Sequence, residues 1–189
     1  MKTIALEDKT YQKLSKLKSK ISMLRNMSFN FSELIEETLR IPTGLLLLDD
    51  LLRDSIISLI KELSMDDSVV GVILYGSVAK GNFQVNSDVD LFVISTGNLS
   101  NVFDFVESTI QKIELQLSKE LTSRKLPATF SPLIVSLGET EFLRPIFFDV
   151  ADSGIVLYDR FGTSLNFVER YLAVPHKREY TKDGEILTW

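Results

Sequence analysis

One feature constrains this 189-residue chain more than any other: a buried strand runs into Gly76-Ser77, and ten residues separate Ser77 from Asp88, with Asp90 two positions further on. The apolar run 69–75 reads as the strand, and a turn of helix after it would point free backbone N–H groups at an anion. Asp88 and Asp90 are two residues apart, so on a strand both carboxylates point to one face. The spacing predicts a phosphate-binding turn beside a pair of acids.

The pair of acids predicts a metal site. Two carboxylates held side by side repel each other, and a hard divalent cation such as Mg²⁺ or Mn²⁺ removes that cost while it bridges phosphate oxygens. A cation beside a cradled triphosphate indicates nucleotidyl transfer. The alternative interpretation of the same residues is a tight turn followed by an acidic edge strand.

The segments 76–81 and 87–91 together resemble the signature of the DNA polymerase β-like nucleotidyltransferase superfamily, especially its minimal prokaryotic and archaeal members. The likeness extends from about Leu45 to about Leu172, since 145–149 and 154–160 are similar to the last part of such domains. The resemblance implies that Asp88 and Asp90 ligate magnesium. It implies that the nucleotide is held by Gly76, Ser77, Lys80 and Ser87.

One departure from that family pattern concerns a third acid, which active members usually carry on the next core strand. The corresponding stretch, 128–135, contains no Asp or Glu, and Ser131 lies near the expected position. Glu139, Glu141 and Asp149 are the nearest acids in the sequence, but Asp149 follows Pro145 in what reads as a helix start. Glu141 is therefore the predicted replacement. The predicted catalytic residues are Asp88, Asp90 and Glu141.

Composition excludes several other classes of protein. Hydrophobic residues make up 44% of the chain and charged residues 25%, as in an ordinary globular protein that buries a core. The apolar run 45–48 is broken at once by Asp49 and Asp50, so we expect no membrane-spanning segment. The absence of cysteine excludes disulfides and Cys-ligated zinc, and it fits a cytoplasmic protein.

The N-terminal segment differs in charge from the remainder. Residues 1–28 carry a net charge of +5, whereas the whole chain carries −5. A short strand at 2–6 and two predicted helices within residues 1–43 resemble the ribbon–helix–helix fold of antitoxin-like DNA-binding proteins. That resemblance implies a homodimer, because so short a unit must pair its strand with a second copy. It also implies contacts with duplex DNA from Lys2, Thr3, Ala5 and Lys9. The alternative is a helical appendage with a solvated lysine face.

The predicted fold class is α/β (α+β), with a small mixed sheet of about four strands and flanking helices, preceded by a strand–helix–helix module. We expect strands near 69–75, 88–95, 130–136 and 155–158, and a helix capped by Ser100. The predicted domains are the N-terminal module at 1–43, the nucleotidyltransferase domain at 44–174 and a polar tail at 175–189.

Two functions remain open from the sequence. The first is a magnesium-dependent enzyme that transfers a nucleoside monophosphate from a nucleoside triphosphate to a hydroxyl acceptor. The acceptor, whether a protein, an RNA end or a small molecule, is not encoded in the motif. The second is a regulator or antitoxin that binds nucleotide with little or no turnover, contacts DNA through its N-terminus and has a toxin protein as its partner.

Overall fold

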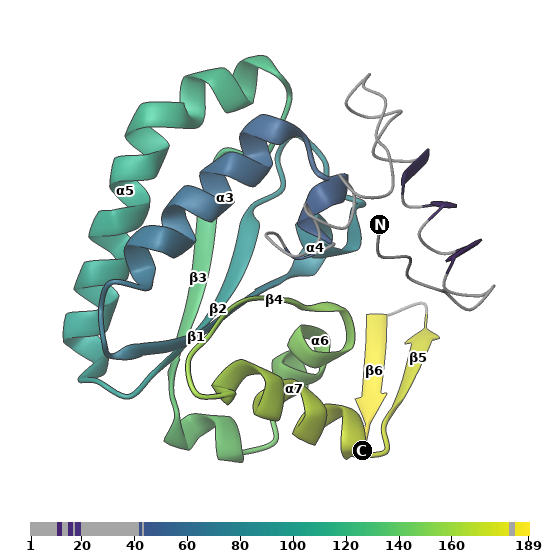
Figure 1. Cartoon of the computed structure of the whole chain (residues 1–189). Helices are drawn as coiled ribbons and strands as arrows, with labels where there is room; N and C mark the ends of the chain where they lie inside the picture. The colour runs from purple at the N-terminus through teal and green to yellow at the C-terminus, as the bar shows by residue number, and fades with distance from the viewer. Residues whose placement is uncertain (1–10, 13–14, 17, 20–41, 43, 182–183) are drawn as a thin grey trace, which may run out of the picture. The chain divides into compact units, whose positions relative to one another are not determined.

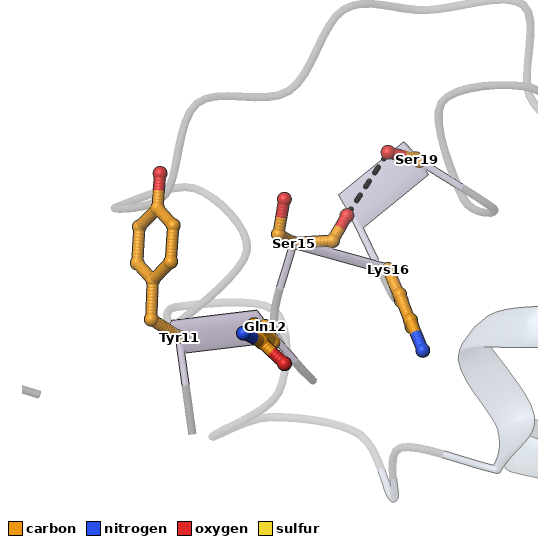
Figure 2. A pocket seen from close by; sticks show the side chains of 5 residues that line it. All are labelled: Tyr11, Gln12, Ser15, Lys16 and Ser19. Carbon is orange, nitrogen blue, oxygen red and sulfur yellow. Dashed lines mark hydrogen bonds between the residues drawn. The ribbon is translucent and has the colours of Figure 1, made fainter. Parts of the chain in front are cut away.

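The computed structural model describes residues 11–12, 15–16, 18–19, 42, 44–181 and 184–189. The chain divides into two compact units, residues 1–53 and 54–189. In the first unit the described residues between Tyr11 and Ser19 are helical, and Figure 2 shows the Ser19 hydroxyl donating to the Ser15 carbonyl at 3.0 Å. These helical residues border a shallow hollow lined by Tyr11, Gln12, Ser15, Lys16 and Ser19. The predicted DNA contacts Lys2, Thr3, Ala5 and Lys9 lie outside the described residues.

A four-stranded mixed sheet forms the centre of the second unit, in the order β3-β2-β1-β4. The strand β1 pairs antiparallel with both β2 and β4, whereas β2 and β3 run parallel. This arrangement confirms the predicted fold class, and the strands lie within one residue of the predicted ranges. Their bounds are Val69–Tyr75 (β1), Val89–Ser95 (β2), Phe130–Ser136 (β3) and Ile155–Asp159 (β4).

Helices cover the sheet, as Figure 1 shows. The long helix α5 packs against β3, whereas α6 packs against β1 and α7 against both β1 and β4. The side chain of Asn98, rather than the predicted Ser100, caps α5 by accepting the backbone N–H groups of Ser100 and Asn101. Within residues 44–181, the helices of the second unit are α4 (Gly76–Lys80), α5 (Leu99–Ser123), η2 (Gly138–Glu141), α6 (Pro145–Ser153) and α7 (Thr163–Ala173). Two further helices of this stretch, η1 (Leu45–Leu47) and α3 (Asp50–Leu63), begin in the first unit.

An aromatic cluster fixes α6 and α7 on the sheet. The ring of Phe92, on β2, lies 5.2 Å from that of Phe147 on α6 and 4.8 Å from that of Phe167 on α7. All three side chains are fully or almost fully buried. Edge-to-face and tilted ring pairs of this kind add to the free energy gained by burying apolar surface. The cluster therefore determines which face of the sheet α6 covers.

The segment predicted as a polar tail forms a β-hairpin, with strands β5 (Lys177–Thr181) and β6 (Gly184–Thr188). Figure 1 shows it beside α6 and α7. The Trp189 ring stacks on Phe148 of α6 at 5.5 Å, and the His176 ring lies 4.7 Å from that same Phe148 ring. Phe148 itself is fully buried, so the hairpin is attached to the aromatic core. Among the described residues, no helix is both long and apolar enough to cross a membrane.

Candidate active site

The C-terminal end of β1 and the N-terminal end of β2 lie side by side at one end of the strands. The antiparallel register sets Tyr75 opposite Asp90, and α4 begins at Gly76, directly after Tyr75. Gly76 has a φ of +71°, a conformation that favours glycine. A Cβ atom at this position would lie 2.1 Å from Oδ2 of Asp90. The Asp90 carboxylate therefore packs against the backbone of the turn that the sequence assigned to phosphate binding.

Asp88 and Asp90 interact, as their spacing predicts. Asp88 is exposed just before β2, whereas Asp90 is half-buried in the strand. Burial raises the pKa of Asp90, and the negative charge of Asp88 raises it further. A divalent cation would relieve both effects, so the donor set fits a hard cation. Within the described part of the chain, no group of three or more His, Cys, Asp or Glu side chains could hold a metal ion. Asp88 and Asp90 remain the predicted metal ligands.

A further acid, Asp149, acts on Tyr75 beside the paired acids. The half-buried phenol of Tyr75 has a pKa raised to about 12, mainly by burial and then by the negative charges of Asp90 and Asp149. Asp149 lies on α6, which packs against both β1 and α4. The sequence set Asp149 aside as part of a helix start. Asp149 does lie in a helix, and the packing of that helix brings the Asp149 carboxylate to the same end of the strands as Asp90.

The remaining predicted nucleotide-binding residues lie on or near α4. Ser77 is half-buried in that helix, and its carbonyl accepts the N–H groups of Gly81 and Asn82. Lys80 ends the helix and is exposed. The Ser87 hydroxyl accepts the backbone N–H of Gln84 at 2.8 Å. Ser87 therefore has a local role in closing the turn before Asp88, while a role in nucleotide binding remains a prediction for all three side chains.

Ser131 lies near the position where the family resemblance leads us to expect a third acid. In the parallel pairing of β2 with β3, Ser131 is the register partner of Asp90. Register partners in a sheet point their side chains to the same face. The strand next to Asp90 therefore presents a hydroxyl where the family pattern has a carboxylate.

The prediction that Glu141 replaces this acid is wrong. Because β3 runs parallel to β2, it leads away from Asp90, and Glu141 lies in η2 beyond the far end of β3. A seven-residue strand spans about 20 Å. At that far end the Glu141 carboxylate pairs with Arg170 of α7, at 2.6 Å between Oε1 and Nη1. Glu141 was predicted because it follows β3 closely in the sequence, but the direction of β3 takes it away from Asp90.

The contact between Gly76 and Asp90 can be tested with a matched pair of variants. Gly76 and Gly81 share a φ of +71°, but a Cβ at Gly81 would meet nothing within 4 Å. Both Gly→Ala changes should cost about 1–2 kcal/mol through backbone strain. Gly76→Ala should in addition displace Asp90 and weaken Mn²⁺ binding, followed by electron paramagnetic resonance, by about tenfold or more. Equal Mn²⁺ affinity in the two variants would mean that Asp90 takes no part in holding the cation.

The chain is similar to several known proteins. A family model described as Polymerase beta, Nucleotidyltransferase matches residues 58–161, more than half of the chain. A search of curated proteins finds no match. Among solved structures, a chain in a toxin–antitoxin complex with AMP-PNP is 18% identical with a TM-score of 0.40, over 64% of this chain and 83% of that one. A chain in the complex of tri-AMPylated Shewanella oneidensis HEPN toxin with MNT antitoxin is 17% identical with a TM-score of 0.38, over 64% and 80%.

The family assignment rests on the family model, whose match contains β1, the Gly76 turn, both paired acids and β3. The chain belongs to the polymerase β nucleotidyltransferase family, and it is a nucleotidyltransferase by that membership.

Proposed function

We propose that the protein transfers a nucleoside monophosphate from a nucleoside triphosphate to a hydroxyl acceptor in a reaction that depends on Mg²⁺. The observation that carries the proposal is the contact of the Asp90 carboxylate with the Gly76 turn, beside Asp88. This contact joins the expected phosphate site to the expected cation site. A metal-bridged triphosphate needs both at one place.

Different residues would bind the phosphates and the cation. The backbone N–H groups at the start of α4 and the Ser77 hydroxyl would hold phosphate oxygens, while Asp88 and Asp90 would hold the cation. The bound cation would neutralise charge on the phosphates and make the acceptor hydroxyl easier to deprotonate. The acceptor oxygen would then form a bond to the α-phosphorus and lose its proton to solvent, while the bond from that phosphorus to the bridging oxygen breaks and pyrophosphate leaves.

Turnover should be slow, because Ser131 stands beside Asp90 where a third carboxylate is expected. A third acid would help to ligate the cation on the side of the attacking hydroxyl or accept its proton. This serine supports the second candidate function, a regulator that binds nucleotide without efficient transfer. For either function we propose a toxin protein as partner, because residues 1–43 resemble antitoxin-like segments. For the enzyme, a hydroxyl on that toxin is the first acceptor to test.

Nucleotide binding should require a divalent cation and both acids. The variant Asp88→Asn/Asp90→Asn should lose Mg²⁺-dependent binding of ATP, measured by titration calorimetry, because no carboxylates remain to hold the cation. Glu62→Gln/Asp104→Asn removes two exposed acids elsewhere and should bind as the wild type does. An ATP affinity that is unchanged in excess chelator, or in the Asp88→Asn/Asp90→Asn variant, would refute the proposed site.

An acid restored at Ser131 should raise turnover. Ser131→Asp should increase pyrophosphate release at saturating Mg²⁺ by about a hundredfold, the lower end of the range for a positioned proton acceptor. Ser131→Asn has a similar size without the charge and should not do so. If Ser131→Asp leaves the rate at the wild-type value, the missing carboxylate is not what limits the reaction.

DNA binding by the N-terminal segment is a separate proposal, which rests on the net charge of +5 in residues 1–28. Affinity for duplex DNA should fall steeply with salt, because each neutralised phosphate releases counterions. Lys2→Gln/Lys9→Gln should lower the slope of log affinity against log salt by roughly two. Lys61→Gln/Lys112→Gln removes two exposed lysines elsewhere and should leave the slope unchanged. A full-length protein that ignores DNA at low salt would refute this proposal.

A further inference from the structure

One arginine of the C-terminal hairpin bridges two acids of α6. Nη1 of Arg178 lies 2.6 Å from Oδ1 of Asp149, and Nη2 lies 2.8 Å from Oδ2 of Asp152. The Nε atom of Arg178 also donates to Asp152, at 3.0 Å. Asp149 and Asp152 are three residues apart on the helix and so share one face. The Arg178 side chain is only 20% exposed, which reduces solvent screening of these pairs.

The aromatic core holds this bridge in place. Trp189 and His176, at the two ends of the hairpin, both contact Phe148, the neighbour of Asp149 on α6. Nε2 of His176 lies 3.1 Å from Oδ2 of Asp152. Asp152 therefore faces both His176 and Arg178, whereas Asp149 faces Arg178. Phe148 is fully buried in the same cluster against which Tyr75 packs. The position of Arg178 is therefore set by burial as well as by its ion pairs.

Asp149 is the link between this bridge and the candidate active site. The helix that carries it packs against α4, whose first residue is Gly76, and against β1, whose last residue is Tyr75. Like the carboxylate of Asp90, that of Asp149 acts on the Tyr75 phenol. Asp149 thus places a negative charge next to the site where, on the proposed function, a polyanion must bind.

We propose that Arg178 is a positioning residue for nucleotide binding: it turns the Asp149 carboxylate toward the hairpin and neutralises its charge, and so the hairpin sets the affinity of the site for a nucleoside triphosphate. This inference rests on the proposed function. Without Arg178 the charge of Asp149 would repel the triphosphate and attract a cation. The effects on anion and cation binding are therefore opposite in sign, which damage to the fold would not produce.

The test uses the full-length protein with ATP and Mn²⁺ as probes. Arg178→Gln should weaken ATP binding at saturating Mg²⁺ by about tenfold and should tighten the binding of Mn²⁺ alone by several-fold. Both changes should shrink at high salt. Arg178→Lys keeps the charge but cannot bridge both acids, and its two affinities should lie between those of Arg178→Gln and the wild type. Arg178→Gln/Asp149→Asn also removes Asp149, the partner acid that acts on the site, and should restore both affinities.

Arg170→Gln is the matched control. It breaks an ion pair of the same length, Arg170 with Glu141, beyond the far end of β3 from Asp90. This control variant should change neither affinity. The inference is overturned if Arg178→Gln binds both probes as the wild type does, or if Asp149→Asn fails to reverse its effects. Wild-type protein without Mg²⁺-dependent ATP binding would refute the proposed function instead, and the Mn²⁺ measurements would still decide the role of Arg178.

Discussion

The antiparallel pairing of β1 with β2 is the constraint on which the rest of the site depends. It sets Tyr75 opposite Asp90, so that the turn at Gly76 closes directly onto the carboxylate. A slip of one residue would move Asp90 to the other face of the sheet, away from α4 and α6. The same register sets Ile73 opposite Phe92 deeper in the sheet. Burial of Phe92 among the rings of α6 and α7 opposes such a slip, so the aromatic core holds the site in register.

The local structure could be predicted because its signals are short in range. The strands follow from their apolar runs, and β2–β3 pairing sets Ser131 beside Asp90. A shared face for Asp88 and Asp90 stays a prediction, because Asp88 precedes β2. Glu141 could not be placed in this way. Its distance from Asp90 depends on β3 running parallel to β2, which the sequence near Glu141 does not encode.

The C-terminal hairpin was hidden from sequence analysis for a related reason. Its first strand, Lys177–Thr181, is polar, and no apolar alternation marks it. What holds the hairpin lies elsewhere in the chain: Phe148 beneath Trp189, and Asp149 and Asp152 opposite Arg178. Asp149 was missed as a neighbour of the site because Pro145 correctly indicated a helix, and a helix start alone does not show which strands the helix will cover.

Ser131 and the ion pair of Arg178 with Asp149 both make the candidate site less negative. Ser131 removes a carboxylate that the family pattern would place beside Asp90, and the ion pair with Arg178 offsets the carboxylate of Asp149. Asp88 and Asp90 are then the acids that a cation must neutralise. A site with fewer uncompensated negative charges binds a triphosphate at a lower electrostatic cost. It also lacks the group best placed to accept a proton from the acceptor hydroxyl. On the proposed function, Ser131 would therefore favour holding the nucleotide and would slow its transfer, whereas Arg178 would favour holding it without supplying a proton acceptor.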